Sequence, residues 1–355
     1  MGRGFSPLDE ELALLPGSLT PHLQEELAHL GTWMPFAPAA AMLARFTGVA
    51  VSAATAQRQA EVVGRAAEAV QAQDVAWIEA ELPPAPAGPE RALVSVDGAM
   101  VPLRHGEWAE TKSLVVGEVE APSRAAGDTA GDTAGDTAGD TAGDTAGDDR
   151  HARALSYFSR QTDAETFGRL ALGEIQRRGV ENAGQVAAVS DGAEWIQGFV
   201  DLHCPQAVRI LDFAHAAERV AALGEALAPA DPSWLSIQLH RLKHAGPEAL
   251  LADLRAQVAA HPSAPALQEH LNYLDKRLAQ MQYPTFQEAG WPLGSGVVES
   301  ANKLVVEARL KGAGMHWERT NVNPMLALRN AVCNDRWDET WARSSADLRQ
   351  HPRPR

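Results

Sequence analysis

A change of hydrophobic pattern at residue 91 constrains the fold of this chain most. Before this point apolar residues recur at helical spacing, whereas after it short apolar segments of strand length follow one another. The predicted strands cover residues 92–103, 112–119, 152–159, 185–192 and 207–212. The first three favour an antiparallel meander, and the last two are apolar runs that end at an acid, as in buried parallel strands. The pattern therefore predicts an α/β domain with a mixed sheet.

Helices complete the predicted order of elements. Thr162 and Glu165 fit a capping box at the start of one helix, which Gly179 ends. A second helix, AEWIQGFVDLH, separates the last two strands. Three strands, a helix, a strand, a helix and a strand make the order of an RNase H-like fold. We therefore expect an RNase H-like mixed sheet with helices.

Composition excludes a membrane protein and leaves nucleic acid open as a partner. The 355-residue chain is 45% hydrophobic and 22% charged, without an apolar run of membrane-spanning length. Its N-terminus lacks a secretion signal, so we expect a cytoplasmic protein. The net charge of −15 argues against DNA binding, but seven Asp lie in residues 126–149 alone. Residues 303–355 are locally positive, with ten Lys or Arg against six Asp or Glu.

Residues 126–145 are five copies of Ala-Gly-Asp-Thr, followed by Ala-Gly-Asp-Asp. Without apolar positions the tract has no surface to offset the entropy of ordering, so we predict a disordered surface insertion over 126–149. The two cysteines, Cys204 and Cys333, are too few for a disulfide framework or a four-cysteine zinc site, and we expect buried thiols.

Three acidic residues are expected to meet at one point of this fold. Asp97 lies within the first strand, Asp191 ends the fourth, and Glu299 falls in the first turns of a helix that begins near Ser295. Ligands gather at the carboxyl ends of strands in open α/β sheets. Three carboxylates there would suit Mg²⁺ or Mn²⁺, and two such ions would support in-line phosphoryl transfer. Taken singly, each acid also fits a turn or an exposed helical position.

Helical segments surround the sheet in the predicted domain organisation. Residues 37–46 and 52–66, with Ser52 as N-cap, have the spacing of a helix-turn-helix or of a plain helical hairpin. The predicted boundaries are a helical, candidate DNA-binding region (1–82), a linker (83–90), the first part of the catalytic domain (91–212), a helical insertion (213–290), the final catalytic helix with C-terminal helices (291–345), and a tail (346–355).

Several segments carry a resemblance to a known family. They are VSVDGAMVPL, VAAVSDGAEWI, ILDFAHAAE and YPTFQEAGWPLGSGVVESANKLVVEARLKGAGMHW, the last being the most specific. In this order they resemble the insertion-sequence transposases of the ISKra group, relatives of the Mutator-like transposases, over about residues 7–341. The resemblance implies an RNase H-like fold with a helical insertion and catalytic acids at Asp97, Asp191 and Glu299. It also implies DNA ends and target DNA as partners and a homo-oligomer on DNA. The cysteine-rich N-terminal segment that members often carry is absent.

Asp212 and His215 show the Asp-x-x-His spacing found in Mutator-like enzymes. We expect them, together with Asn302, to orient the metal ligands or to contact DNA. The alternative is a helix-capping Asp with a half-buried His. Asp212 is also the rival of Asp191 for the role of second catalytic acid.

The segment after Glu299 holds candidate DNA contacts. Lys303, Arg309 and Lys311 are placed to hold phosphates, with a solvated helical face as the alternative. Trp291 and Trp317 either stack on unpaired bases or belong to the core. Three other tryptophans are expected to pack in the interior: Trp108, Trp195 and Trp234.

The expected function is that of a DDE transposase. Such an enzyme hydrolyses a phosphodiester at the element's end and then directs the freed 3′-hydroxyl at target DNA. Two alternatives are an RNase H-like nuclease that cuts without joining and a domesticated, inactive DNA-binding protein.

Overall fold

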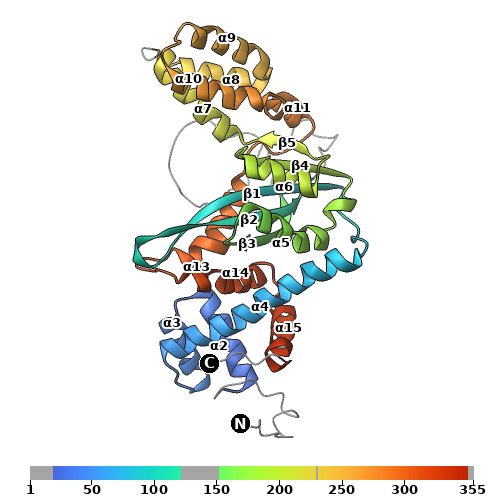
Figure 1. The fold of residues 1–355 in the computed structure, drawn as a ribbon, viewed down its shortest axis with the longest axis vertical. Coiled ribbons are helices and arrows are strands. Elements are labelled where there is room, and N and C mark those ends of the chain that lie inside the picture. Colours follow the sequence, from blue (N-terminus) through green and yellow to red (C-terminus); the bar gives the residue numbers. More distant parts are fainter. Residues whose placement is uncertain (1–18, 121–151, 229–230, 351–355) are drawn as a thin grey trace, which may run out of the picture.

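The computed structural model describes residues 19–120, 152–228 and 231–350 (Figure 1). Five strands form one mixed sheet in the order β3-β2-β1-β4-β5. They are β1 (Arg91–Pro102), β2 (Trp108–Glu118), β3 (Arg153–Arg160), β4 (Gln185–Ser190) and β5 (Val208–Leu211). The antiparallel β1-β2-β3 meander and the parallel β4 and β5 confirm the predicted mixed α/β sheet. The Ala-Gly-Asp-Thr repeat lies outside the described residues.

Residues of β1 alternate between the two faces of the sheet, as the strand repeat of two requires. Val94 and Val96 pack against α5 (Ala164–Arg177) and α6 (Glu194–His203). The opposite face, which includes Asp97, is covered by a continuous helical segment. It consists of α12 (Gly296–Ala301), the π-helix η4 (Asn302–Glu307) and α13 (Ala308–Leu310). The last helix of the predicted catalytic core therefore crosses the face that carries Asp97.

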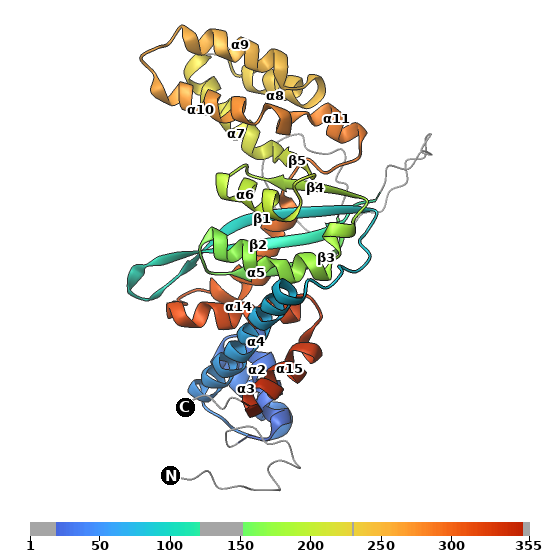
Figure 2. The same cartoon turned by 45° about the vertical axis from the view of Figure 1, so that its right-hand side comes forward.

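The helices of residues 213–290 stand at one end of the sheet, beyond β5 (Figures 1 and 2). They are α7 (Phe213–Leu227), α8 (Trp234–Ala245), α9 (Pro247–Ala259), α10 (Pro265–Lys276), η3 (Leu278–Met281) and α11 (Tyr283–Glu288). We call them the helical subdomain. Leu93, Val189 and Leu211 of the sheet share one apolar core with it. This continuous core fixes the subdomain beside the carboxyl ends of β4 and β5.

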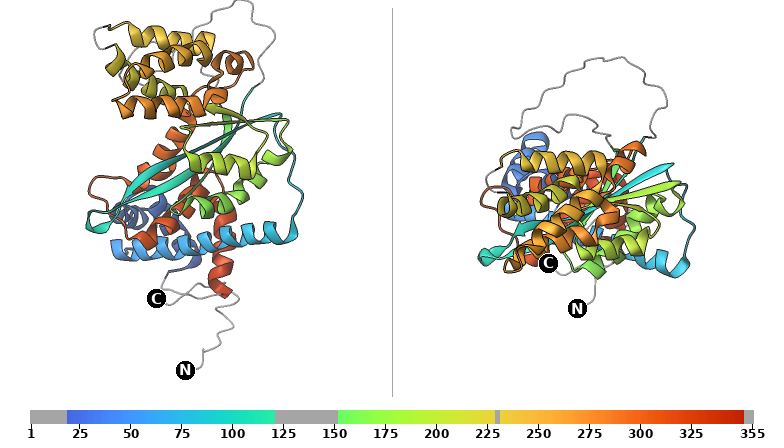
Figure 3. Two further views of the ribbon diagram at one scale, coloured as in Figure 1. Left: turned by 45° about the horizontal axis from the view of Figure 1, so that its top comes forward. Right: turned by 90° about the horizontal axis from the view of Figure 1, so that it is seen from above.

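The remaining helices form a layer at the other end of the molecule (Figure 3). They are α2 (Pro21–Trp33), α3 (Phe36–Thr47), α4 (Ala53–Glu81), α14 (Arg319–Cys333) and α15 (Trp337–Gln350). Ser52 caps α4 as predicted, with its side chain accepting from the Thr55 amide, and Gly48 (φ +75°) ends α3. The helix α4 runs on to Glu81, well past the predicted end. It packs closely along α14, since a Cβ on Gly64 would lie 2.4 Å from the Pro324 carbonyl oxygen.

Two local predictions are wrong. Helix α5 is capped by Asp163, whose Oδ1 accepts from the Thr166 amide at 2.8 Å, and not by Thr162. Aspartate is the stronger N-cap of the two, so the helix begins one residue later than predicted. Trp108 is 56% exposed, because it lies at the tip of the long β1–β2 hairpin.

No helix in the described ranges combines the length and the apolar character that crossing a membrane requires. Of the two thiols expected to be buried, Cys204 is buried and Cys333 is half-buried.

Candidate active site

Asp97 is half-buried in the middle of β1, on the face that η4 covers. Its Oδ1 accepts a hydrogen bond from the Gly98 amide at 2.7 Å, and its Oδ2 accepts one from Nδ2 of Asn302 at 2.9 Å. Asn302 comes from a position 205 residues later, at the first residue of the π-helix. The carboxylate is therefore oriented by the same helical segment that carries Glu299.

Asp191 immediately follows β4, which runs parallel to β1 and pairs with it directly. Its Oδ1 accepts from the Ala193 amide at 2.8 Å, so the side chain closes the turn that leads into α6. The backbone of this turn is held by the helical subdomain. Tyr273 donates its hydroxyl to the Asp191 carbonyl, and Arg277 donates to the Gly192 carbonyl, with Nε at 3.0 Å. These contacts fix the direction in which Asp191 leaves the sheet.

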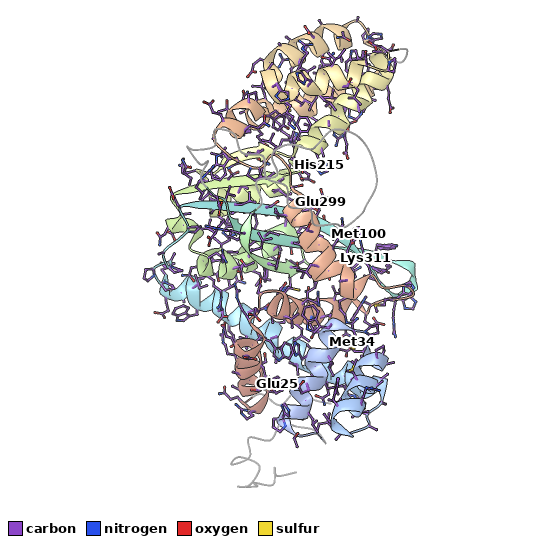
Figure 4. The ribbon with its side chains drawn as sticks, turned by 180° about the vertical axis from the view of Figure 1, so that it is seen from behind. Glu25, Met34, Met100, His215, Glu299 and Lys311 are labelled. Carbon is purple, nitrogen blue, oxygen red and sulfur yellow. The ribbon has the colours of Figure 1, made fainter. Side chains whose placement is uncertain are left out.

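Glu299 is exposed on α12, which lies on the sheet through Val298 and Ala301 packed against Val115. Figure 4 shows Glu299 and His215 on one side of the molecule, with the helix of Glu299 running across the sheet towards Lys311. The third predicted acid thus faces solvent next to the junction of the sheet and the helical subdomain.

The electrostatics of Asp97 link the three acids. Burial raises the pKa of Asp97 above its ordinary value, and the charges of Asp191 and Glu299 raise it further. The Gly98 amide and His215 act in the opposite direction. The Asp97 carboxylate therefore interacts electrostatically with Asp191, Glu299 and His215.

A metal ion suits the chemistry of these groups. In the described part of the chain no three His, Cys, Asp or Glu side chains form a group that could hold a metal ion. Mg²⁺, however, is commonly held by one or two carboxylates and keeps several waters. The buried Oδ1 of Asn302 has no hydrogen-bond partner, although Nδ2 of the same amide binds Asp97. An acceptor left open beside a carboxylate is a place for ion-bound water, so the residues fit a hydrated divalent ion.

Asp212 is buried, and its carboxylate oxygens accept hydrogen bonds from the protein. Its Oδ1 caps α7 by accepting from the Ala214 amide at 2.6 Å. Its Oδ2 accepts from the Ser295 amide at 2.5 Å and from the Ser295 hydroxyl. Both oxygens are therefore in use, which favours the helix-capping interpretation over a role as second catalytic acid. His215, in the first turn of α7, is half-buried, with its Nδ1 3.5 Å from Oε2 of Glu218.

The three predicted phosphate contacts have different surroundings. Lys303 is exposed, and Lys311 donates to Oε1 of Glu307 at 2.6 Å. Arg309 is only 2% exposed: its Nε donates to the Gly31 carbonyl, and its guanidinium contacts the rings of Phe36 and Trp317. Burial, followed by the charge of Arg329, lowers its pKa to about 10. The expected DNA contact by Arg309 is wrong for this conformation, because packing by α2 and α3 covers the side chain.

The two flanking tryptophans belong to the core. Trp317 is 7% exposed and donates from Nε1 to the Leu310 carbonyl at 3.1 Å. Trp291 is 5% exposed and lies under the guanidinium of Arg91. Neither ring is free to stack on a base. Trp195 and Trp234 are half-buried and pack as expected, the former against Phe167.

Sequence reasoning missed Tyr273, Arg277 and Ser295, which hold the segments on either side of the acids. Ser295 had a weak signal as the residue before the helix of Glu299. Tyr273 and Arg277 had none, because their partners lie 82 and 85 residues away.

A scan of protein-family models finds none that matches this chain, and a search of curated proteins finds no match either.

Proposed function

We propose that this protein is a DDE transposase of the ISKra group that cuts DNA at insertion-sequence ends and transfers the strand to target DNA. The observation that carries the proposal is the arrangement of Asp97, Asp191 and Glu299. Asp97 lies on β1, Asp191 directly follows the neighbouring parallel strand β4, and Glu299 lies on the helix that covers the face of Asp97. The charges of Asp191 and Glu299 both raise the pKa of Asp97. An acid whose pKa is raised by burial and by other acids is found preferentially at functional sites.

The order and direction of the strands support an RNase H-like domain. An antiparallel three-strand meander followed by two parallel strands is what the sequence pattern predicted for this fold. The π-helix that begins at Asn302 supports a functional role for this segment, because π-turns are frequent at functional sites.

Asp97 and Asp191 would hold Mg²⁺ or Mn²⁺, with Glu299 and waters completing the set, and two ions are expected. When bound, the ions would supply Lewis-acid stabilisation of the phosphodiester oxygens and an activated nucleophile. The chain's own residues supply the positioning. Asn302 holds the Asp97 carboxylate, and Asp212 ties the start of the Glu299 helix to the end of β5.

DNA as the partner is supported by free cations on the N-terminal helices. Arg45 of α3 and Arg58 of α4 are exposed, and neither has an ion-pair partner within the described ranges. They flank the turn at Gly48. We include in the proposal a homo-oligomer on paired DNA ends, because a transposase must act on two ends together.

The proposal is tested first by metal binding. Titration of Mn²⁺, followed by electron paramagnetic resonance, should show binding to the wild-type protein. Binding should weaken strongly in Asp97→Asn and Asp191→Asn, with a smaller loss in Glu299→Gln. Glu225→Gln, which removes an exposed acid of α7, is the matched control and should bind as the wild type does.

The second test is catalytic. Labelled duplexes from the DNA that borders the coding sequence are incubated with the protein, Mn²⁺ and a target plasmid. Joined products support the transposase, whereas cleavage without joining supports the RNase H-like nuclease. DNA binding with neither activity, together with no Mn²⁺ binding, supports the inactive DNA-binding protein and refutes the proposal.

A further inference from the structure

A cleft of about 810 Å³ opens between the start of α6 and the helical subdomain. Three cationic side chains line it, namely Arg219 of α7, Lys276 of α10, and Arg277, which follows α10 directly. Arg219 contacts a ring nitrogen of His270 at 3.3 Å and the face of Tyr273 at 4.5 Å. In the described ranges none of the three has a carboxylate partner.

The cations of this cleft differ from two arginines of the same subdomain that have carboxylate partners. Elsewhere in the same subdomain, Arg241 pairs with Asp253 at 2.9 Å and Arg255 pairs with Asp275 at 2.8 Å. Cations without carboxylate partners leave a positive electrostatic potential at the surface, and this potential attracts an anionic ligand.

Two carboxylates, Glu194 and Glu269, also line the cleft, and both are exposed. They leave three cations against two anions, so the cleft is not a uniformly basic surface. The three cations come from two helices, α7 and α10, and from the residue that follows α10, so they suit a ligand with several spaced charges better than a single phosphate ion.

Two residues that line the cleft, Tyr273 and Arg277, also hold the turn of Asp191. The guanidinium groups of Arg219 and Arg277 both contact the ring of Tyr273, with their Cζ atoms 4.5 and 3.8 Å from its centroid. Tyr273 and Arg277 in turn donate to the carbonyls of Asp191 and Gly192. A phosphate chain in the cleft would therefore lie next to the proposed acids, which themselves repel phosphates and cannot hold DNA unaided.

We propose that this cleft binds the sugar-phosphate backbone of DNA beside Asp191, with Arg219 and Lys276 as the direct phosphate contacts. The inference rests on the proposed function, and it names the surface on which the substrate lies. Arg277 contributes positive potential from a side chain that is only 9% exposed and holds the wall in place.

The test is metal-free DNA binding as a function of salt. A fluorescein-labelled duplex of mixed sequence is titrated with the protein in EDTA, between about 50 and about 200 mM salt, and anisotropy is measured. The main variant is Arg219→Gln with Lys276→Gln. Lys276→Gln alone is a second variant, because this side chain is exposed and its removal leaves the Tyr273 stack intact. Arg241→Gln with Arg255→Gln is the control with the same change of net charge.

The double variant should weaken binding by roughly tenfold per lost contact near 0.1 M salt, and the slope of log K against log salt should fall by about one per cation. Lys276→Gln should show about half of each effect, and the control pair should show much less. Mn²⁺ affinity should stay unchanged in Lys276→Gln and in the control pair.

Equal affinity and slope in the cleft variants and the control pair would overturn the cleft as a DNA contact. In that case Mn²⁺-dependent joining by the wild type would leave the proposed function intact. A wild-type protein that binds Mn²⁺ but no DNA at all would overturn both.

Discussion

Replacing Asp212 by alanine should destabilise the protein by about 4 kcal/mol. The change removes the cap of α7, which is worth about 1 kcal/mol. It also leaves the amide and hydroxyl of Ser295 without their acceptor in a buried place, at about 1–3 kcal/mol for each group. Because α12 starts directly after Ser295, the same change should also weaken Mn²⁺ binding by loosening the helix of Glu299.

Asp212→Asn separates the two roles of this residue. Asparagine caps helices about as well as aspartate, so α7 keeps its cap. Its amide nitrogen, however, would meet the Ser295 N–H, donor against donor, and we expect a loss of about 2 kcal/mol. Ser295→Ala removes only the hydroxyl and should cost less. The free energy of unfolding is measured by urea denaturation followed by circular dichroism, and Mn²⁺ affinity is measured on the same samples below the transition.

Two results would refute this reasoning. A loss of less than about 1 kcal/mol in Asp212→Ala would show that the Ser295 contacts carry little energy. Loss of Mn²⁺ binding in Asp212→Asn at nearly unchanged stability, matching Asp191→Asn, would make Asp212 a metal ligand and not a support of the site.

Two further perturbations follow from the structure. Gly192→Ala should lower the free energy of unfolding, measured by urea denaturation, by about 3 kcal/mol. Gly192 has φ +78°, and a Cβ there would lie 2.4 Å from Nε of Arg277 and displace the hydrogen bond that Arg277 donates to the Gly192 carbonyl. A loss below about 1 kcal/mol would show that this hydrogen bond contributes little to stability. Hydrogen bonds from the Thr166 amide and then from its hydroxyl lower the pKa of Asp163 from 3.8 to about 2. The stability that this cap provides is therefore present above pH 3.8 and is lost as the pH falls towards 2. Asp163→Asn, which caps without titrating, should show a smaller fall in melting temperature over this window, and identical curves would speak against the linkage.

The positions of Asp97 and Asp191 were predictable because strand patterns are local. Alternation along residues 92–103 puts Asp97 on one face of β1, and an apolar run that ends at Asp191 predicts a buried strand with an exposed end. The cap of α4 at Ser52 was predictable for the same reason, since a cap involves residues only three apart. Where two neighbouring residues can both cap a helix, the local pattern does not decide between them, and the predicted cap of α5 at Thr162 was one residue before the observed cap, Asp163.

The surroundings of Arg309 and Trp317 were not predictable from local pattern. Both lie in a segment rich in basic and aromatic residues, and such a composition is equally typical of a DNA-binding surface and of a buried contact between helices. The decision came from Gly31 and Phe36, almost 280 residues away in the chain, which cover the guanidinium. Trp108 shows the reverse case, since a residue type that is usually buried is exposed by the length of a hairpin.

By itself the sequence determined the kinds and order of the elements: a helical start, a three-strand meander, two parallel strands and a long helical insertion before the segment of Glu299. Hydrogen bonding and side-chain periodicity act over a few residues, so a linear pattern carries them. Only the tertiary structure decided that Asn302 holds Asp97, that Tyr273 and Arg277 hold the Asp191 turn, and that Asp212 is occupied by Ser295. These contacts join residues between 82 and 205 positions apart, and only the packing of the whole chain brings them together.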